Sequence, residues 1–116
     1  KAIKKIINSE KLFGQWNDFV VNANWTSNVK EGFFKLWVNG QLAYHYIGRT
    51  VAPDDQITVQ FGIYRGAAQS SGDARHVVYY DEIRKAKSCK KLKLGKLGYS
   101  CKDLEGQKLE NIYTIQ

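Results

Sequence analysis

The chain has 116 residues, of which 43% are hydrophobic and 13% are aromatic, and its formal net charge is +7. This length fits one domain with a genuine core, and no apolar run approaches the roughly 18 residues of a membrane span. The chain begins with Lys1 and shows no secretory signal sequence, so we expect a mature, trimmed or partial chain.

The positive charge is concentrated in one segment. Residues 1–83 hold nine Lys or Arg and eight Asp or Glu, whereas residues 84–102 hold eight Lys or Arg and no acidic residue. A local basic cluster binds polyanions by releasing their counterions. A solvated tail that favours solubility explains the same charge equally well. Nucleic acid is not the expected partner.

The N-terminal part predicts an arm followed by a strand. Residues 1–13 fit either a short amphipathic helix or an irregular arm, because their isoleucines have helical spacing but are β-branched. Residues 15–26 alternate as a strand with one buried face. The side chains on that face are Phe19, Val21, Ala23 and Trp25.

Residues 33–46 predict a β-hairpin. Asn39-Gly40 between two apolar runs is the strongest short-range hairpin signal, because both residues tolerate the positive φ of a type I′ turn. A two-residue turn pairs Val38 with Gln41 and Trp37 with Leu42. With regular pairing, Lys35 then lies opposite Tyr44 and Phe33 lies opposite Tyr46.

Directly opposed residues share a face of the sheet, so this register predicts one core-like face and one mixed face. The core-like face carries Phe34, Leu36, Val38, Gln41, Ala43 and His45. The mixed face carries Phe33, Lys35, Trp37, Leu42, Tyr44 and Tyr46. Aromatic rings around a cation suit an acidic sugar. The alternative is that Lys35 only extends its charge to the rim of a second core layer.

Two further strands are expected after the hairpin. Residues 57–66 and 76–84 alternate in the strand pattern and are separated by a small, polar loop. Short strands joined by turns predict an antiparallel β-sandwich or jelly roll of the concanavalin-like type. A jelly roll has about eight strands, and this sequence predicts fewer. We therefore expect another chain or a missing N-terminal segment to complete the sandwich.

The two cysteines lie in the basic segment. Cys89 and Cys101 have eleven residues between them and no nearby histidine pair, which disfavours a zinc site. A disulfide is the simplest use of them and implies a secreted or periplasmic protein, whereas two free buried thiols are the alternative. No metal and no other cofactor is expected. The predicted organisation is an arm (1–13), a β-sandwich portion (14–86) and a basic cysteine-loop extension (87–116).

Several motifs together resemble one family of enzymes. Residues 14–50, "GQWNDFVVNANWTSNVKEGFFKLWVNGQLAYHYIGRT", are followed by "QFGIYRG" and "VVYYDEIR". Each motif is common alone, but their order and spacing resemble the C-terminal half of a jelly-roll polysaccharide lyase. The nearest members are the heparin-lyase-I-like and glucuronan-lyase-like enzymes, with alginate lyases more distant. The extension after Lys85 lies outside the resemblance.

The resemblance implies β-elimination on an anionic polysaccharide that contains uronates. One residue neutralises the uronate carboxylate, a base removes the neighbouring proton, and an acid protonates the leaving oxygen. The candidate catalytic residues are Tyr64, Arg65, His76 and Tyr80. The candidate substrate-binding residues are Lys35, Trp37, Tyr44, Tyr46 and Gln60.

This sequence departs from the family in two respects. The chain has no counterpart of the N-terminal half of such lyases. Thr58 and Gln60 also stand where alginate-lyase-type members have Tyr and Lys. Three functions are therefore compatible with the sequence: a polysaccharide lyase, a non-catalytic carbohydrate-binding module, and a structural subunit built on half a sandwich. The resemblance favours the lyase.

Overall fold

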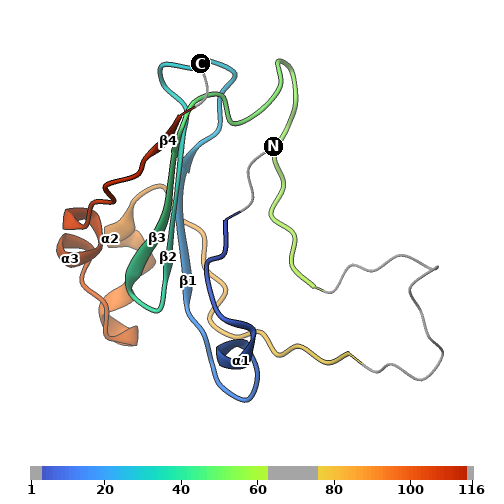
Figure 1. Cartoon of the computed structure of the whole chain (residues 1–116), viewed down its shortest axis with the longest axis vertical. Coiled ribbons are helices and arrows are strands. Elements are labelled where there is room, and N and C mark those ends of the chain that lie inside the picture. The colour runs from blue at the N-terminus through green and yellow to red at the C-terminus, as the bar shows by residue number, and fades with distance from the viewer. Residues whose placement is uncertain (1–3, 63–75, 115–116) are drawn as a thin grey trace.

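The computed structural model describes residues 4–62 and 76–114. It contains a four-stranded sheet in the order β1 (Phe19–Asn24), β2 (Phe33–Val38), β3 (Gln41–Ile47) and β4 (Tyr113–Thr114) (Figure 1). The first three strands are antiparallel, whereas β4 pairs in parallel with β3 at the sheet edge. A one-turn helix, α1 (Ser9–Leu12), precedes the sheet. None of the described helices is long and apolar enough to cross a membrane.

The β2–β3 hairpin forms at the predicted turn, with a β-bulge beyond its second pair. Asn39 and Gly40 both have positive φ, and the pairs Val38–Gln41 and Trp37–Leu42 are confirmed. The register then shifts between Leu36 and Trp37, so that Ala43 has no partner. From Leu36 back to Phe33, each β2 residue therefore pairs with the β3 residue that follows the predicted one in the sequence. A bulge of this kind moves every following side chain to the other face.

The predicted mixed face is consequently wrong. Lys35 pairs with His45 instead of Tyr44, and Tyr44 and Tyr46 pair with Leu36 and Phe34. Because paired residues share a face, the sheet has two distinct faces. We call them the polar face, because it carries Asn22, Lys35 and His45, and the aromatic face. The polar face carries Val20, Asn22, Phe33, Lys35, Trp37, Leu42, His45 and Ile47. The aromatic face carries Phe19, Val21, Trp25, Phe34, Leu36, Tyr44, Tyr46 and Tyr113.

Residues 88–109, here called the C-terminal cap, cover one end of the polar face. They form α2 (Cys89–Leu92), the 3-10 helix η2 (Leu94–Leu97) and α3 (Cys101–Gly106), which lie beside the sheet in Figure 1. Leu94 and Leu104 pack on Trp37 and Leu42 in a core in which all four are less than 10% exposed. Trp37 Nε1 also donates to the Leu104 carbonyl at 2.9 Å. The described core is therefore shared between the hairpin and the cap.

Two side chains of the cap hold the hairpin turn. The Gln107 amide accepts from the Leu42 N–H at 2.6 Å and donates to the Gly40 carbonyl at 2.8 Å. The Tyr99 ring lies over Gly40, where an added Cβ would come within 2.8 Å of a ring carbon. The turn thus requires glycine twice, because φ is +82° and because the ring fills the space of a side chain.

The Tyr99 hydroxyl links the cap to the start of the sheet and predicts a pH effect. It donates to the Asp18 carboxylate, and this hydrogen bond, followed by burial, raises the pKa of Tyr99 to about 12. Since the folded pKa lies above the usual 10, this contribution to stability is intact below pH 10 and is lost as pH rises through about 12. Between pH 10 and about 12, the midpoint temperature of thermal unfolding should therefore fall more steeply for the wild type than for Tyr99→Phe. Parallel curves would contradict this prediction.

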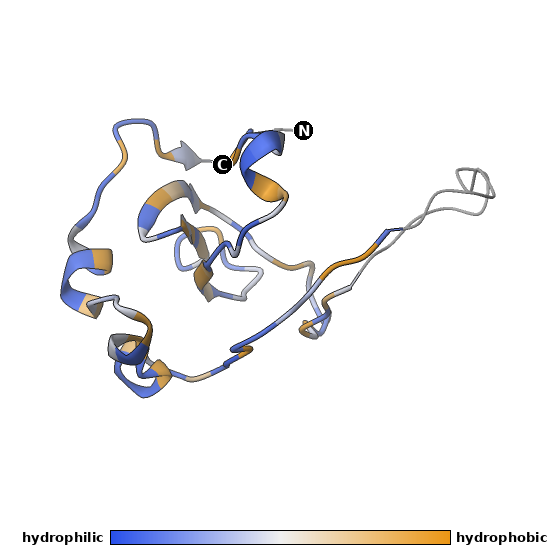
Figure 2. Cartoon of the chain, turned by 90° about the horizontal axis from the view of Figure 1, so that it is seen from below, coloured by the Kyte–Doolittle hydropathy of each residue, from blue (hydrophilic) through white to orange (hydrophobic). Residues whose placement is uncertain are grey.

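Other expectations about the fold are corrected. The described parts of the predicted strands 57–66 and 76–84 form no strand, because neither segment has a hydrogen-bonded ladder with a neighbour. They run as extended segments in which Phe61 and Tyr80 make ring contact at 5.2 Å. Figure 2 shows hydrophobic residues along these segments, and most of those side chains are exposed. The predicted sandwich or jelly roll is not confirmed, since the described residues form one open mixed sheet.

The predicted buried face of the first strand is also wrong. Phe19, Val21 and Trp25 are 47–49% exposed, whereas Val20, on the opposite side, packs against the core of the cap. The physical reason is that the cap supplies the apolar partner, and it lies on the polar face. The predicted disulfide is confirmed, because Cys89 and Cys101 are bonded and link α2 to α3.

Candidate functional site

Three polar side chains form a row across the polar face. Asn22 on β1 pairs with Lys35 on β2, and Lys35 pairs with His45 on β3. Paired residues of an antiparallel sheet have Cβ atoms about 4.5–5.5 Å apart, so Lys35 lies close to both Asn22 and His45, which flank it on the two neighbouring strands. Asn22 is exposed, and Lys35 and His45 are half-buried. The row therefore places an amide, an ammonium and an imidazole on an accessible strip of sheet.

The surroundings of His45 favour its neutral form. Burial, and after it the positive charge of Lys35, lowers the pKa of His45 from its usual 6.5. A neutral imidazole at neutral pH can accept a proton. Lys35 supplies the opposite function, because its ammonium attracts a carboxylate. The two residues thus provide a base and an anion-binding group side by side.

Asn22 and His45 were not among the candidates that the sequence suggested. Regular pairing from the Asn39-Gly40 turn places His45 on the face opposite Lys35, and only the bulge at Ala43 brings the two together. Nothing in the hairpin sequence marks the bulge, because Ala43 is compatible with either arrangement. The usable signal was the polar residue Asn22 between Val21 and Ala23 in the preceding strand.

The aromatic face carries a chain of ring contacts. The Trp25 and Phe34 ring centroids are 6.0 Å apart, and those of Phe34 and Tyr44 are 6.2 Å apart. Tyr46 contacts Tyr113 at 6.0 Å across the β3–β4 pair. Burial, with smaller effects from Tyr113 and Tyr46, raises the pKa of Tyr44, so its hydroxyl remains protonated at neutral pH. This face is apolar and contains no lysine or arginine among its paired residues.

The four predicted sugar-binding residues of the hairpin do not form one surface. Lys35 lies on the polar face, and Tyr44 and Tyr46 lie half-buried on the aromatic face. Trp37 shares the polar face with Lys35 but is 2% exposed, because the cap covers it. Its ring therefore has no free face on which a sugar can stack, and its role in the structure is that of a core residue.

The remaining predicted site residues lie away from the sheet or outside the description. Gln60, His76 and Tyr80 are exposed on the two extended segments. Tyr80 makes the ring contact between those segments with Phe61, and Gln60 precedes Phe61 in the chain. Tyr64 and Arg65 lie outside the described residues. Gln60, His76 and Tyr80 thus lie off the strands that carry the row formed by Asn22, Lys35 and His45.

One group of candidate metal ligands occurs in the described part of the chain. The sulfurs of Cys89 and Cys101 and a carboxylate oxygen of Glu105 lie within 4.8 Å of one another. The disulfide consumes both thiolates, which are the species that bind metal. This group is therefore a disulfide bond with an exposed carboxylate beside it.

Comparison with known proteins identifies the family of the chain. The family model described as polysaccharide lyase matches residues 3–84, which include the row on the polar face and exclude the cap. The chain therefore belongs to the polysaccharide lyase family. No curated protein and no solved structure is significantly similar to it.

Proposed function

We propose that the chain binds an acidic, uronate-containing polysaccharide at the row on the polar face and cleaves it by β-elimination. The observation that carries this proposal is the in-register alignment of Asn22, Lys35 and His45 within the region that matches the lyase family. Lys35 and Asn22 bind the uronate carboxylate, which lowers the cost of the carbanionic intermediate. Neutral His45 accepts the proton next to that carboxylate.

The other candidate residues complete the reaction in this proposal. Elimination also needs a group that protonates the leaving glycosidic oxygen, and Tyr64 and Tyr80 are the proposed donors. Arg65, His76 and Gln60 are proposed to contact the sugar or its carboxylate. Tyr44 and Tyr46 are proposed as sugar contacts on the aromatic face of the sheet. The disulfide and the family are both consistent with an extracellular location, where such polysaccharides occur.

The test measures the ultraviolet absorbance of the unsaturated uronate that elimination creates. Glucuronan, alginate and a heparin-type polysaccharide are incubated separately with the protein. We expect His45→Gln to lower the rate on the cleaved substrate by about 10²-fold or more, because a general base contributes that much. Lys35→Gln should weaken binding as well as rate. Lys30→Gln removes an equal charge from an exposed turn and should change neither.

The pH dependence gives a second readout. Because His45 acts when neutral and its pKa is lowered, the acid limb of the rate profile should have its midpoint below pH 6.5. Lys35→Gln removes one cause of the lowered pKa, so the midpoint should move upward toward 6.5, while burial still holds it below that value. If Lys35→Gln leaves the midpoint of the acid limb unchanged, the assignment of His45 as the base is contradicted.

A non-catalytic binding module is the second candidate function. It is favoured by the open sheet, since Gln60, His76 and Tyr80 lie on segments outside it. Retained binding of polyuronate without any unsaturated product, in wild type and His45→Gln alike, would support this function and exclude the lyase. No binding by the wild type would exclude both.

A further inference from the structure

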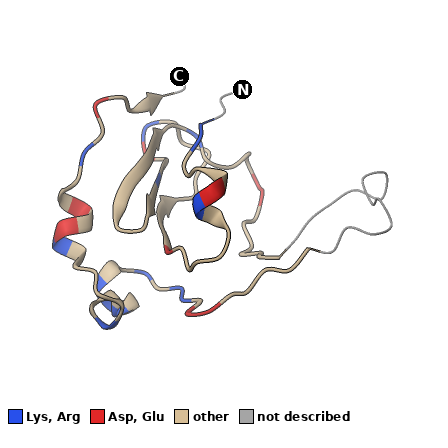
Figure 3. Ribbon diagram, turned by 60° about the horizontal axis from the view of Figure 1, so that its bottom comes forward, with Lys and Arg blue, Asp and Glu red and all other residues tan. Residues whose placement is uncertain are grey.

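The C-terminal cap and the segment that leads into it form a basic pocket that the proposed lyase function does not use. It has a cavity volume of about 420 Å³ and is lined by Arg84, Lys85, Lys91, Leu92, Lys93 and Lys96. Five of these six residues are basic and none is acidic. Figure 3 shows the Lys and Arg residues concentrated on α2 and the segment before it. All but Arg84 lie beyond the family match, so the pocket is largely an addition to the family's shared region.

Arg84 builds the pocket rather than serving as a free anion-binding group. Its Nη1 atom donates to the carbonyls of Leu92 and Lys93 at 2.7 and 3.0 Å, and its guanidinium pairs with Glu82. The guanidinium therefore satisfies the last carbonyls of α2, which have no helical partner. This contact ties the segment that enters the cap to the end of the helix.

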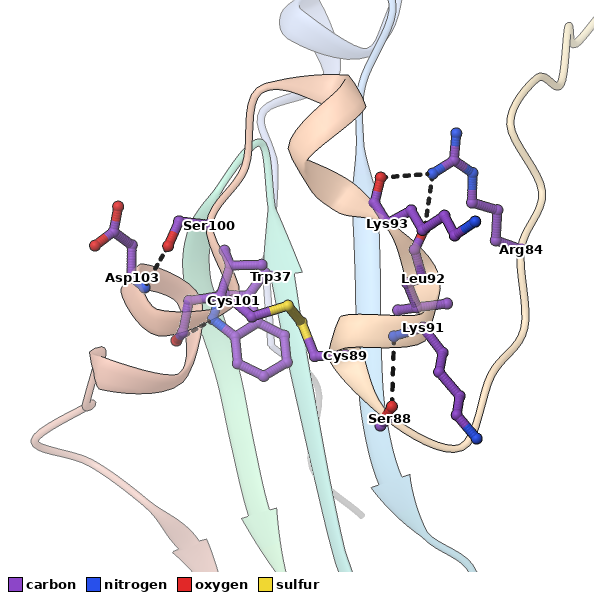
Figure 4. The surroundings of a disulfide bond; sticks show 11 residues. Trp37, Arg84, Ser88, Cys89, Lys91, Leu92, Lys93, Ser100, Cys101 and Asp103 are labelled. Atoms are coloured by element: carbon purple, nitrogen blue, oxygen red, sulfur yellow. Dashed lines mark hydrogen bonds between the residues drawn. A yellow bond between two sulfur atoms is a disulfide. The ribbon is translucent and has the colours of Figure 1, made fainter.

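Three other features hold the lysines in place. The Ser88 hydroxyl accepts from the Lys91 N–H and caps α2. Lys93 ends the helix with a left-handed φ of +55°. The disulfide fixes α2 to α3. In Figure 4 the side chains of Lys91 and Lys93 extend on the side of the cap from which Arg84 approaches. The charges are thus gathered by a cross-linked scaffold, not by a loose tail.

The pocket lysines lack acidic partners within the described part of the chain. The one salt bridge found there joins Arg84 to Glu82, so Lys85, Lys91, Lys93 and Lys96 keep their positive charge uncompensated. Like charges held close together repel, and a bound anion relieves that repulsion. An ammonium group is a compact point charge that donates hydrogen bonds to carboxylate or sulfate oxygens without a fixed geometry.

We propose that this pocket is an anion-binding subsite for a polysaccharide segment with closely spaced carboxylate or sulfate groups. The choice of a glycan rests on the proposed function, because the lyase-like sheet and the pocket belong to one chain. It also rests on the lining residues, which include no aromatic ring on which a nucleic-acid base could stack. The pocket holds the polymer outside the row at which it reacts.

The experiment compares two triple variants of the full chain. Lys91→Gln, Lys93→Gln and Lys96→Gln remove three pocket charges. Lys87→Gln, Lys90→Gln and Lys102→Gln remove the same charge from neighbouring positions that do not line the pocket. Affinities are measured by calorimetry for a heparin oligosaccharide, a polyglucuronate oligosaccharide and neutral dextran, at about 50 and about 200 mM salt.

We expect the pocket variant to bind at least one acidic glycan about tenfold more weakly than the wild type, and with a smaller salt dependence. The matched variant should change much less, and dextran should not bind. The two acidic glycans distinguish sulfate from carboxylate as the bound group. Equal thermal midpoints of both variants show that folding is unchanged.

Equal affinities of the two triple variants would overturn the pocket and leave a diffuse charge effect in its place. Tighter binding of a single-stranded oligonucleotide than of either glycan would overturn the choice of ligand. Failure of the lyase proposal is separate, because it appears as the absence of unsaturated product and of any effect of Lys35→Gln. If the pocket triple variant binds the acidic glycan more weakly but still forms the unsaturated product, both proposals are supported.

Discussion

We expect Trp37→Ala to lower the free energy of unfolding by about 3–5 kcal/mol, the usual cost of removing a buried tryptophan. The side chain is 2% exposed and lies between the hairpin and the cap, where it contacts the leucines of both. Its removal leaves a cavity that the short helices of the cap cannot fill without moving. It also leaves the Leu104 carbonyl without the indole donor, at a position where water has little access.

The measurement is denaturant unfolding followed by circular dichroism, with Trp16→Ala as the matched control. Trp16 is 67% exposed, so the same change of residue should cost less than about 1 kcal/mol there. Trp37→Phe keeps a smaller aromatic ring but removes the N–H donor and part of the buried volume, so its loss of stability should lie between zero and that of Trp37→Ala. Equal losses for the two alanine variants would contradict the central position of Trp37.

Local signals in the sequence predicted the hairpin but could not predict its faces. Asn39-Gly40 specifies a two-residue turn through positive φ, and the two pairs nearest the turn follow from it. The bulge at Ala43 depends on how β3 meets its neighbours and the cap, and no residue type demands it. One unpaired residue was enough to separate Tyr44 and Tyr46 from Lys35 and to bring His45 to Lys35.

The apolar partner of the polar face comes from the basic segment and the residues just after it. Residues 84–102 drew attention to lysine, yet the same stretch contains Leu94, and Leu104 follows shortly after it. Both leucines contribute to the core on Trp37, whose hydrogen bond spans 67 residues. Alternation along a strand identifies which side chains share a face. It does not tell which face will find an apolar partner, since that depends on a distant element.

The predicted strands 57–66 and 76–84 show the limit of the pattern more directly. Their alternation is as regular as that of β1, but a strand exists only when a neighbour completes its hydrogen bonds. In the described parts of these segments the contact is between side chains, Phe61 and Tyr80, without a backbone ladder. The resemblance to polysaccharide lyases, by contrast, depended on the order of several motifs, and the match over residues 3–84 confirms it at the level of the family.

Reduction of the Cys89–Cys101 disulfide is expected to lower the free energy of unfolding by about 3 kcal/mol in the chain-entropy model. The bond joins residues 12 apart in sequence and closes the loop that contains Leu94, with Leu104 just beyond it. When the bond is present, the unfolded chain has fewer conformations to lose on folding. The helices of four and six residues that it joins are too short to be stable alone.

The test is denaturant unfolding with and without a thiol reductant, carried out on the wild type and on the Cys89→Ser/Cys101→Ser variant. Reductant should shift the wild-type curve toward that of the variant and leave the variant unchanged. The expected loss falls mainly on the cap, so hydrogen exchange at Leu94 and Leu104 should accelerate more than exchange in β1. Alkylation of the unreduced protein should label no thiol. Two results would contradict this role of the disulfide: a wild-type unfolding curve that reductant does not change, and alkylation of both cysteines before reduction. Either result would show that the disulfide does not stabilise the packing of the cap on Trp37.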